Sequence, residues 1–115
     1  MENLAPGSTI YIAGKMRGEH CFNFKNFFFW QVMLENGGYK VLNPAEHDCM
    51  KWINEGWIFD ESQYEEVLAY DFELIENQAD ALFVLEGWLD SEGAKREIEH
   101  AKECGKPVYY QEDIR

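Results

Sequence analysis

The sequence predicts an α/β fold in which helices cover a parallel β-sheet. Short apolar segments alternate with longer segments of helical periodicity, in the order strand, helix, strand, helix, strand, helix, strand. The strand segments are apolar over most of their length, which is typical of strands that are buried on both faces. Together these observations indicate a single domain over residues 1–115, with right-handed crossovers between parallel strands.

Four segments are the expected strands. They comprise residues 8–13, 39–43, 80–86 and 108–110. A glycine-containing loop at 14–18 follows the first strand, and a turn at 90–97 follows the third. Because ligands bind beyond the carboxyl ends of parallel strands, both turns are expected to border a binding site at one edge of the sheet.

The first helix is expected over residues 23–36, and it ends at Gly37 and Gly38. Apolar side chains cover nearly its whole circumference: Phe24, Phe27, Phe28, Phe29, Trp30, Val32, Met33 and Leu34. A helix that is apolar all round is buried on more than one side. Since so small a domain covers one face only, we expect the other face to pack against a second subunit, in a homodimer or a larger homo-oligomer.

The two later helices each turn one carboxylate toward the core. Residues 61–77 carry Asp71 in the middle of an apolar stripe formed by Tyr64, Val67, Leu68, Leu74 and Ile75. In the helix within residues 90–101, Glu97 lies at the edge of the stripe formed by Ala94, Ile98 and Ala101. An inward carboxylate is costly unless something uses it, so Glu97 and Asp71 are candidate catalytic residues. The alternative is that each caps a loop or pairs with a nearby cation.

Two inward carboxylates suit the chemistry of glycosidic bonds. One ionised carboxylate attacks an anomeric carbon, or stabilises cationic charge there, while the other acts as an acid or orients the first. Such a division of roles requires environments that move the two pKa values apart.

The loop G-K-M-R-G at residues 14–18 contains two glycines and two cations. Its consecutive backbone N–H groups could hold a phosphate. It is not a P-loop, because Thr9 stands where the first glycine would be and Met16 replaces the Ser/Thr. A tight turn with solvated cations is the alternative. Ser91, two residues before Gly93, could donate a hydrogen bond to the same anion or cap the last helix.

Composition excludes several classes of partner. A net charge of −12 argues against nucleic acid polymers and anionic membranes, because binding them needs clustered Lys and Arg. The longest apolar runs, at 27–30 and 81–85, are too short to cross a bilayer, and no signal peptide pattern begins the sequence. Three cysteines cannot all pair within one chain, which favours the reducing cytoplasm.

No metal site is expected from the spacing of histidines and cysteines. The pairs His20-Cys21, His47-x-Cys49 and His100-x3-Cys104 lack the spacing of known zinc motifs. The aromatic side chains within residues 52–59 are expected in the core or an interface, with base stacking as the alternative.

Three segments together resemble the nucleoside 2-deoxyribosyltransferase superfamily. They are I-Y-I-A-G-K-M-R-G at 10–18, Asp71 eight to nine residues before Ala79-Asp80, and S-x-G-x3-E at 91–97. The similarity is closest to the 2′-deoxynucleoside 5′-monophosphate N-glycosidases, which have a G-x-x-R-G loop after the first strand and an S-x-G-x3-E segment after a later one. Residues 87–97 also resemble small uncharacterised phage and bacterial proteins, the DUF4406 group. The resemblance spans essentially the whole chain and implies a Rossmann- or flavodoxin-like fold.

The resemblance implies a cofactor-free enzyme that acts on a small nucleotide. Glu97 would attack C1′ and release the base, and Asp71 would be the partner carboxylate. The implied substrate-binding residues are Tyr11 at the sugar, together with Gly14, Lys15, Arg17, Gly18, Ser91 and Gly93 around the 5′-phosphate. Transferases of unphosphorylated nucleosides carry Asp where this chain has Ser91, which favours a nucleotide substrate and an N-glycosidase. The alternatives are a nucleoside 2-deoxyribosyltransferase, or a non-catalytic nucleotide-binding or interaction module on the same fold.

Overall fold

The computed structural model describes residues 1, 3–16, 19, 23–46 and 64–114 of the chain. These residues form a four-stranded sheet in the order β2-β1-β3-β4, in which every neighbouring pair is parallel. The strands are β1 (Thr9–Ala13), β2 (Lys40–Leu42), β3 (Ala81–Val84) and β4 (Val108–Tyr110). The predicted α/β class with a parallel sheet is confirmed, and every strand lies within its predicted segment.

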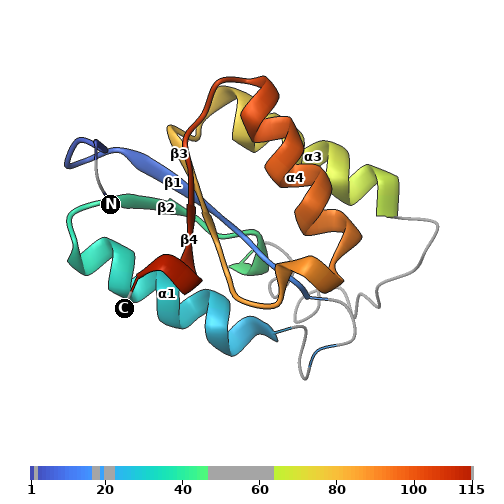
Figure 1. The fold of residues 1–115 in the computed structure, drawn as a ribbon, viewed down its shortest axis with the longest axis horizontal. Coiled ribbons are helices and arrows are strands. Elements are labelled where there is room, and N and C mark those ends of the chain that lie inside the picture. Colours follow the sequence, from blue (N-terminus) through green and yellow to red (C-terminus); the bar gives the residue numbers. More distant parts are fainter. Residues whose placement is uncertain (2, 17–18, 20–22, 47–63, 115) are drawn as a thin grey trace.

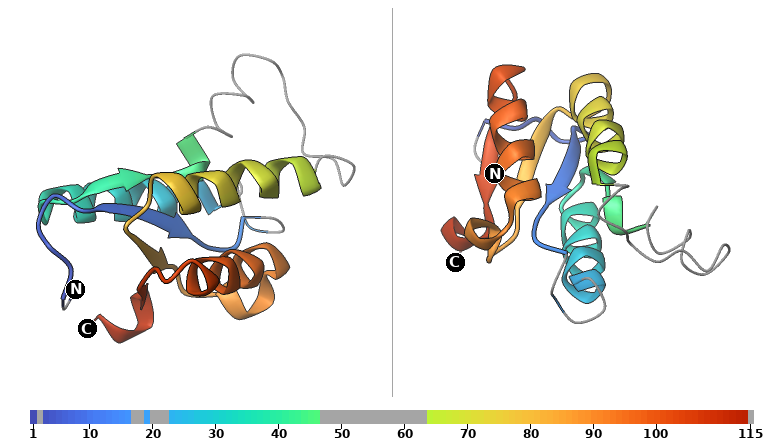
Figure 2. Two further views of the ribbon diagram at one scale, coloured as in Figure 1. Left: turned by 90° about the horizontal axis from the view of Figure 1, so that it is seen from above. Right: turned by 90° about the vertical axis from the view of Figure 1, so that its right-hand side faces the viewer.

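Three longer α-helices in the described part of the chain cover the two faces of the sheet (Figure 1). They are α1 (Phe24–Asn36), α3 (Tyr64–Asn77) and α4 (Glu92–Glu103), and the short 3-10 helices η3 (Trp88–Asp90) and η4 (Gln111–Asp113) follow β3 and β4. Helix α1 covers one face, and α3 and α4 lie side by side on the other (Figures 1 and 2). Right-handed crossovers that run in opposite directions across a sheet place their helices on opposite faces. Among these helices none has the length and apolar content to cross a membrane.

The central strand β1 separates two apolar cores. Ile10 and Ile12 face α1 and belong to a core with Phe27. Tyr11 faces the opposite way and belongs to a core with Ile98 of α4. Because both faces are covered, β3 is apolar along its whole length and β1 is apolar after Thr9, in line with the predicted burial on both faces. The alternation of side chains along β1 therefore directs Tyr11 toward the layer of α3 and α4.

Helix α1 begins and ends close to its predicted bounds, but among the described residues it has buried side chains on one side only. Its buried side chains are Phe24, Phe27 and Leu34. Three apolar side chains of the same helix are exposed: Phe29 (53%), Val32 (55%) and Met33 (48%). The second subunit expected on this side therefore remains a prediction.

Candidate functional site

The carboxyl ends of β1 and β3 form the switch point of the sheet. The chain leaves β1 toward α1 on one face and leaves β3 toward α4 on the other, and ligands bind at such a divergence in doubly wound sheets. The two strand ends approach closely at Gly14, where an added Cβ would lie 3.0 Å from the Cβ of Leu85. A glycine at this position leaves room for the side chain of Leu85.

Tyr11, Glu97 and Asp71 meet in the layer between the sheet and the helices α3 and α4. Tyr11 of β1 is fully buried, and its hydroxyl donates a hydrogen bond to Oε2 of Glu97 at 2.6 Å. Glu97 of α4 is 6% exposed and Asp71 of α3 is 9% exposed. The prediction that both helices turn a carboxylate inward is confirmed. The three groups come from three different elements of the fold.

The electrostatics of this cluster fix the protonation state of the phenol. Burial raises the pKa of Tyr11 well above its ordinary value, and the negative charges of Asp71 and Glu97 raise this pKa further. Hydrogen bonding of the hydroxyl to the same two carboxylates acts in the same direction. Tyr11 is therefore a neutral donor that both carboxylates face. Such an arrangement can hold a carboxylate in one orientation for attack on a bound substrate.

Ser91 stands at the beginning of α4, where it caps the helix. Ser91 is the N-cap of α4, and its Oγ accepts a hydrogen bond from the backbone N–H of Ala94 at 3.1 Å. Gly93 follows in the first turn, where an added Cβ would lie 3.6 Å from the hydroxyl of Tyr64. The cap uses the oxygen of Ser91 as an acceptor, so its hydroxyl proton can still be donated. A donor thus stands at the positive end of the α4 dipole.

The loop after β1 is described in part. The Nζ of Lys15 lies 3.6 Å from a carboxylate oxygen of Glu19, and the carbonyl of Lys15 accepts a hydrogen bond from Asn23 at 3.0 Å. These contacts match the interpretation of a turn with solvated cations as well as that of a phosphate loop. The predicted phosphate ligands Arg17 and Gly18 lie outside the described residues, as do His20, Cys21 and the aromatic residues within 52–59.

A protein family described as "Domain of unknown function (DUF4406)" matches residues 8–110. The chain belongs to this family. The matched region runs from β1 to the end of β4, so it includes Tyr11, Asp71 and Glu97. No curated protein matches the chain.

The sequence did not predict the contacts that Arg96 makes between α3 and α4 in this DUF4406 domain. The guanidinium of Arg96 donates to both carboxylate oxygens of Glu65, at 2.9 and 3.3 Å, and lies 5.8 Å from the ring centre of Tyr64. Hydrogen bonding to Arg96 lowers the pKa of Glu65, and the same bond raises the pKa of Arg96. The hydroxyl of Tyr64 also interacts with Arg96, close to Gly93. Helical periodicity predicted Tyr64 as inward-facing, but it carries no signal for a partner on another helix.

Proposed function

We propose that this DUF4406 domain is an N-glycosidase that cleaves the base–sugar bond of a (deoxy)nucleoside 5′-monophosphate, with Glu97 as the nucleophile. The observation that carries the proposal is the buried hydrogen bond from Tyr11 to Glu97, with Asp71 facing the same hydroxyl. Burial of two carboxylates beside the switch point of the sheet is costly for folding and is typical of a working site. The resemblance to the nucleoside 2-deoxyribosyltransferase superfamily supplies the class of substrate.

In the first step, an oxygen of Glu97 forms a bond to C1′ of the sugar. The C1′–N bond breaks, and its electron pair leaves with the base, which takes up a proton. Tyr11 orients the carboxylate through the hydrogen bond at 2.6 Å. Asp71 is the partner carboxylate, which stabilises the cationic charge that develops on the sugar.

In the second step, the oxygen of a water molecule attacks C1′ and the bond to Glu97 breaks. The water gives up one proton, and the sugar phosphate leaves with a hydroxyl at C1′. Tyr11, held neutral by its surroundings, donates again to the regenerated carboxylate. If a second base replaces water as the acceptor, the same intermediate yields a new nucleotide, and the chain is a deoxyribosyltransferase.

The 5′-phosphate would bind between the loop after β1 and the first turn of α4. Gly14 and Lys15 lie in that loop, and Arg17 and Gly18 follow them in the sequence. Ser91 and Gly93 offer a hydroxyl and a backbone N–H at the positive end of the α4 dipole. A small anion responds to these local groups more than to the net charge of −12, since distant surface charge is screened.

Two wider features belong to the same proposal. We expect the chain to act in the cytoplasm, where nucleotides are abundant and where the exposed, unpaired Cys104 stays reduced. We also expect a homo-oligomer in which the exposed apolar side chains of α1 contact a second copy of the chain.

The direct test is incubation of the purified chain with a panel of deoxynucleoside and ribonucleoside 5′-monophosphates, with and without a second free base. Chromatography should detect free base and sugar phosphate from at least one of them. A new nucleotide that forms only with the second base would identify a transferase. Nucleotide binding seen as a rise in melting temperature, without any product, would leave a binding module and refute the enzyme.

Glu97→Gln tests the assigned nucleophile. We expect turnover to fall by about a thousandfold or more, because an amide cannot form the bond to C1′. The matched control is Glu99→Gln, two residues further along α4 and exposed, which should leave turnover unchanged. Melting temperatures of both variants report whether the fold is intact, and full activity of a folded Glu97→Gln chain would refute the assignment.

A further inference from the structure

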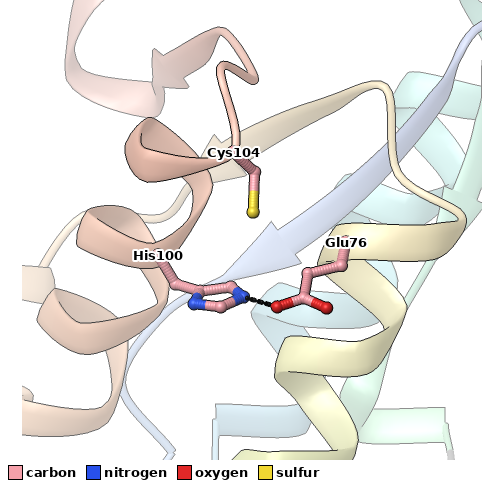
Figure 3. Close-up of side chains that lie close together, drawn as sticks. All are labelled: Glu76, His100 and Cys104. Atoms are coloured by element: carbon pink, nitrogen blue, oxygen red, sulfur yellow. Dashed lines mark ion pairs between the residues drawn. The ribbon is translucent and has the colours of Figure 1, made fainter.

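Three side chains capable of binding a metal gather outside the proposed nucleotide site. Glu76, His100 and Cys104 each offer one ligand atom, and these atoms all lie within 4.8 Å of one another (Figure 3). No other such group was found among the described residues. From the sequence we expected no metal site, because the spacing of His100 and Cys104 does not match a zinc motif. The third side chain, Glu76, belongs to α3, and the spacing of residues along one segment cannot reveal a ligand from another helix.

The packing of α3 against α4 brings the three side chains together. His100 lies in the last turn of α4, and Cys104, four residues later, is the C-cap of this helix, so the two residues lie on the same side. Glu76, near the end of α3, faces them across the helix pair (Figure 3). Phe72, one turn before Glu76, stacks on the imidazole of His100 with ring centres 4.3 Å apart and an interplanar angle of 9°. This stacking fixes the orientation of the imidazole ring before any ligand binds.

The contact between His100 and Glu76 places two possible metal ligands next to each other. The Nε2 atom of His100 lies 2.7 Å from Oε1 of Glu76, but it has no aligned hydrogen-bond partner among the described residues. The two side chains form an ion pair when the imidazole is protonated, as drawn in Figure 3. Both helices end nearby, and the negative ends of their dipoles favour a cation here.

We propose that Glu76, His100 and Cys104 bind a divalent transition metal of the Zn²⁺ class. Thiolate, imidazole and carboxylate together are the ligands of zinc-like ions, whereas Mg²⁺ and Ca²⁺ require oxygen ligands alone. Tetrahedral coordination by such ligands needs atoms about 3.4 to 3.6 Å apart, from typical metal–ligand distances. The exposed side chains of Glu76 and Cys104 can rotate to reach that separation. Water completes the fourth position, and the thiol proton passes to solvent on binding.

The bound metal would join the two helices that carry the buried carboxylates. Glu76 lies five residues after Asp71 on α3, and His100 lies three residues after Glu97 on α4. A metal bound to these side chains would link α3 to α4 and hold the two helices in register. The inference does not rest on the proposed enzymatic activity, because it concerns the C-terminal ends of both helices and needs no nucleotide.

Cobalt titration of the metal-free, reduced chain tests this site. We expect a thiolate-to-Co²⁺ charge-transfer band in the near ultraviolet, with the intense visible bands of tetrahedral Co²⁺, and their loss when Zn²⁺ is added. Cys104→Ser should abolish the charge-transfer band. His100→Gln and Glu76→Gln should each weaken Co²⁺ binding by about tenfold or more, as is typical for the loss of contacts around a metal.

The other cysteines and histidines supply matched controls. Cys21→Ser, Cys49→Ser and His47→Gln should leave the bands and the affinity for Co²⁺ unchanged. Zn²⁺ should also raise the melting temperature of the wild-type chain, but not that of the Cys104→Ser chain. The proposal is overturned by the absence of a charge-transfer band. It is equally overturned if the band survives Cys104→Ser, or disappears in the control variants instead.

Discussion

At the scale of single residues, the site depends on one phenol that faces two carboxylates. A hydrogen bond to a charged group contributes about 1.5 to 3 kcal/mol, which offsets part of the cost of burying Glu97. The helical period predicted the inward direction of Asp71 and Glu97. It could not predict that Glu97 meets Tyr11, because the two residues are separated by 86 positions and lie on different kinds of element. The place of Tyr11 in a substrate site was implied by the family resemblance alone.

The raised pKa of Tyr11 predicts a loss of stability at alkaline pH. The phenol of the unfolded chain ionises near the ordinary value of about 10, while the folded chain keeps Tyr11 neutral. The stability that neutral Tyr11 contributes is complete below that pH. It declines above it by up to about 1.4 kcal/mol per pH unit, until the folded-state pKa is reached.

Tyr11→Phe isolates this effect, since phenylalanine does not ionise. Below about pH 10 the variant should be less stable than the wild type by about 1.5 to 3 kcal/mol, and above that pH the difference should narrow. Urea unfolding measured across this pH range gives both values. The exposed Tyr70 provides the control, Tyr70→Phe. A constant difference between Tyr11→Phe and the wild type at every pH would contradict the assignment.

At the scale of elements, the positions of helices and strands followed from local signals. The glycines after α1, the apolar segments of the strands and the periodicity of α4 predicted those elements to within a few residues. The ion pair of Arg96 with Glu65 could not be predicted, since it depends on how α4 packs against α3. For Ser91 the sequence left two roles open, and the hydrogen bond to Ala94 identifies the cap.

Substitutions at Ser91 separate its role as a cap from the proposed contact with phosphate. Ser91→Ala should lower the free energy of unfolding by about 1 kcal/mol, because the N–H of Ala94 loses its acceptor. Ser91→Asp should keep the stability, because aspartate is an equally good cap and suits the helix dipole. Urea unfolding of the three chains measures both effects.

Ser91→Asp should keep the stability of the wild type but weaken the binding of nucleotides. A carboxylate at position 91 repels a phosphate, so Ser91→Asp should raise the KM for a nucleoside monophosphate by about tenfold or more. The KM for the unphosphorylated nucleoside should not rise. An unchanged KM for the monophosphate in Ser91→Asp would remove Ser91 from the proposed phosphate site while leaving its role as a cap.

At the scale of the whole molecule, the strand order decides where the site lies. The sequence predicted parallel strands and two turns at one edge, but not the order β2-β1-β3-β4. That order depends on which face each helix covers, and long-range packing determines the choice. It makes β1 and β3 neighbours, and so brings Tyr11 beneath the helix that follows β3. It also leaves one side of α1 facing outward.

If a second copy of the chain packs on this side of α1, a charge introduced there should dissociate the oligomer. Val32→Glu places a carboxylate among exposed apolar side chains and should convert the oligomer into monomers. Lys102→Gln changes the net charge by the same amount on the exposed side of α4, which covers the opposite face of the sheet, and should leave the oligomer intact. Sedimentation velocity distinguishes these results. A monomeric wild-type chain at every concentration would contradict the prediction.

The enclosed hydroxyl of Tyr11 gives the protein an internal reporter. A proton held between two oxygens 2.6 Å apart, in a fully buried side chain, exchanges slowly with water and is strongly deshielded. Its magnetic resonance signal should stand apart from the amide signals, and it should vanish in Tyr11→Phe. Any small molecule that reaches Glu97 would displace or shift this signal. Compounds can therefore be screened against the cluster before a substrate is known.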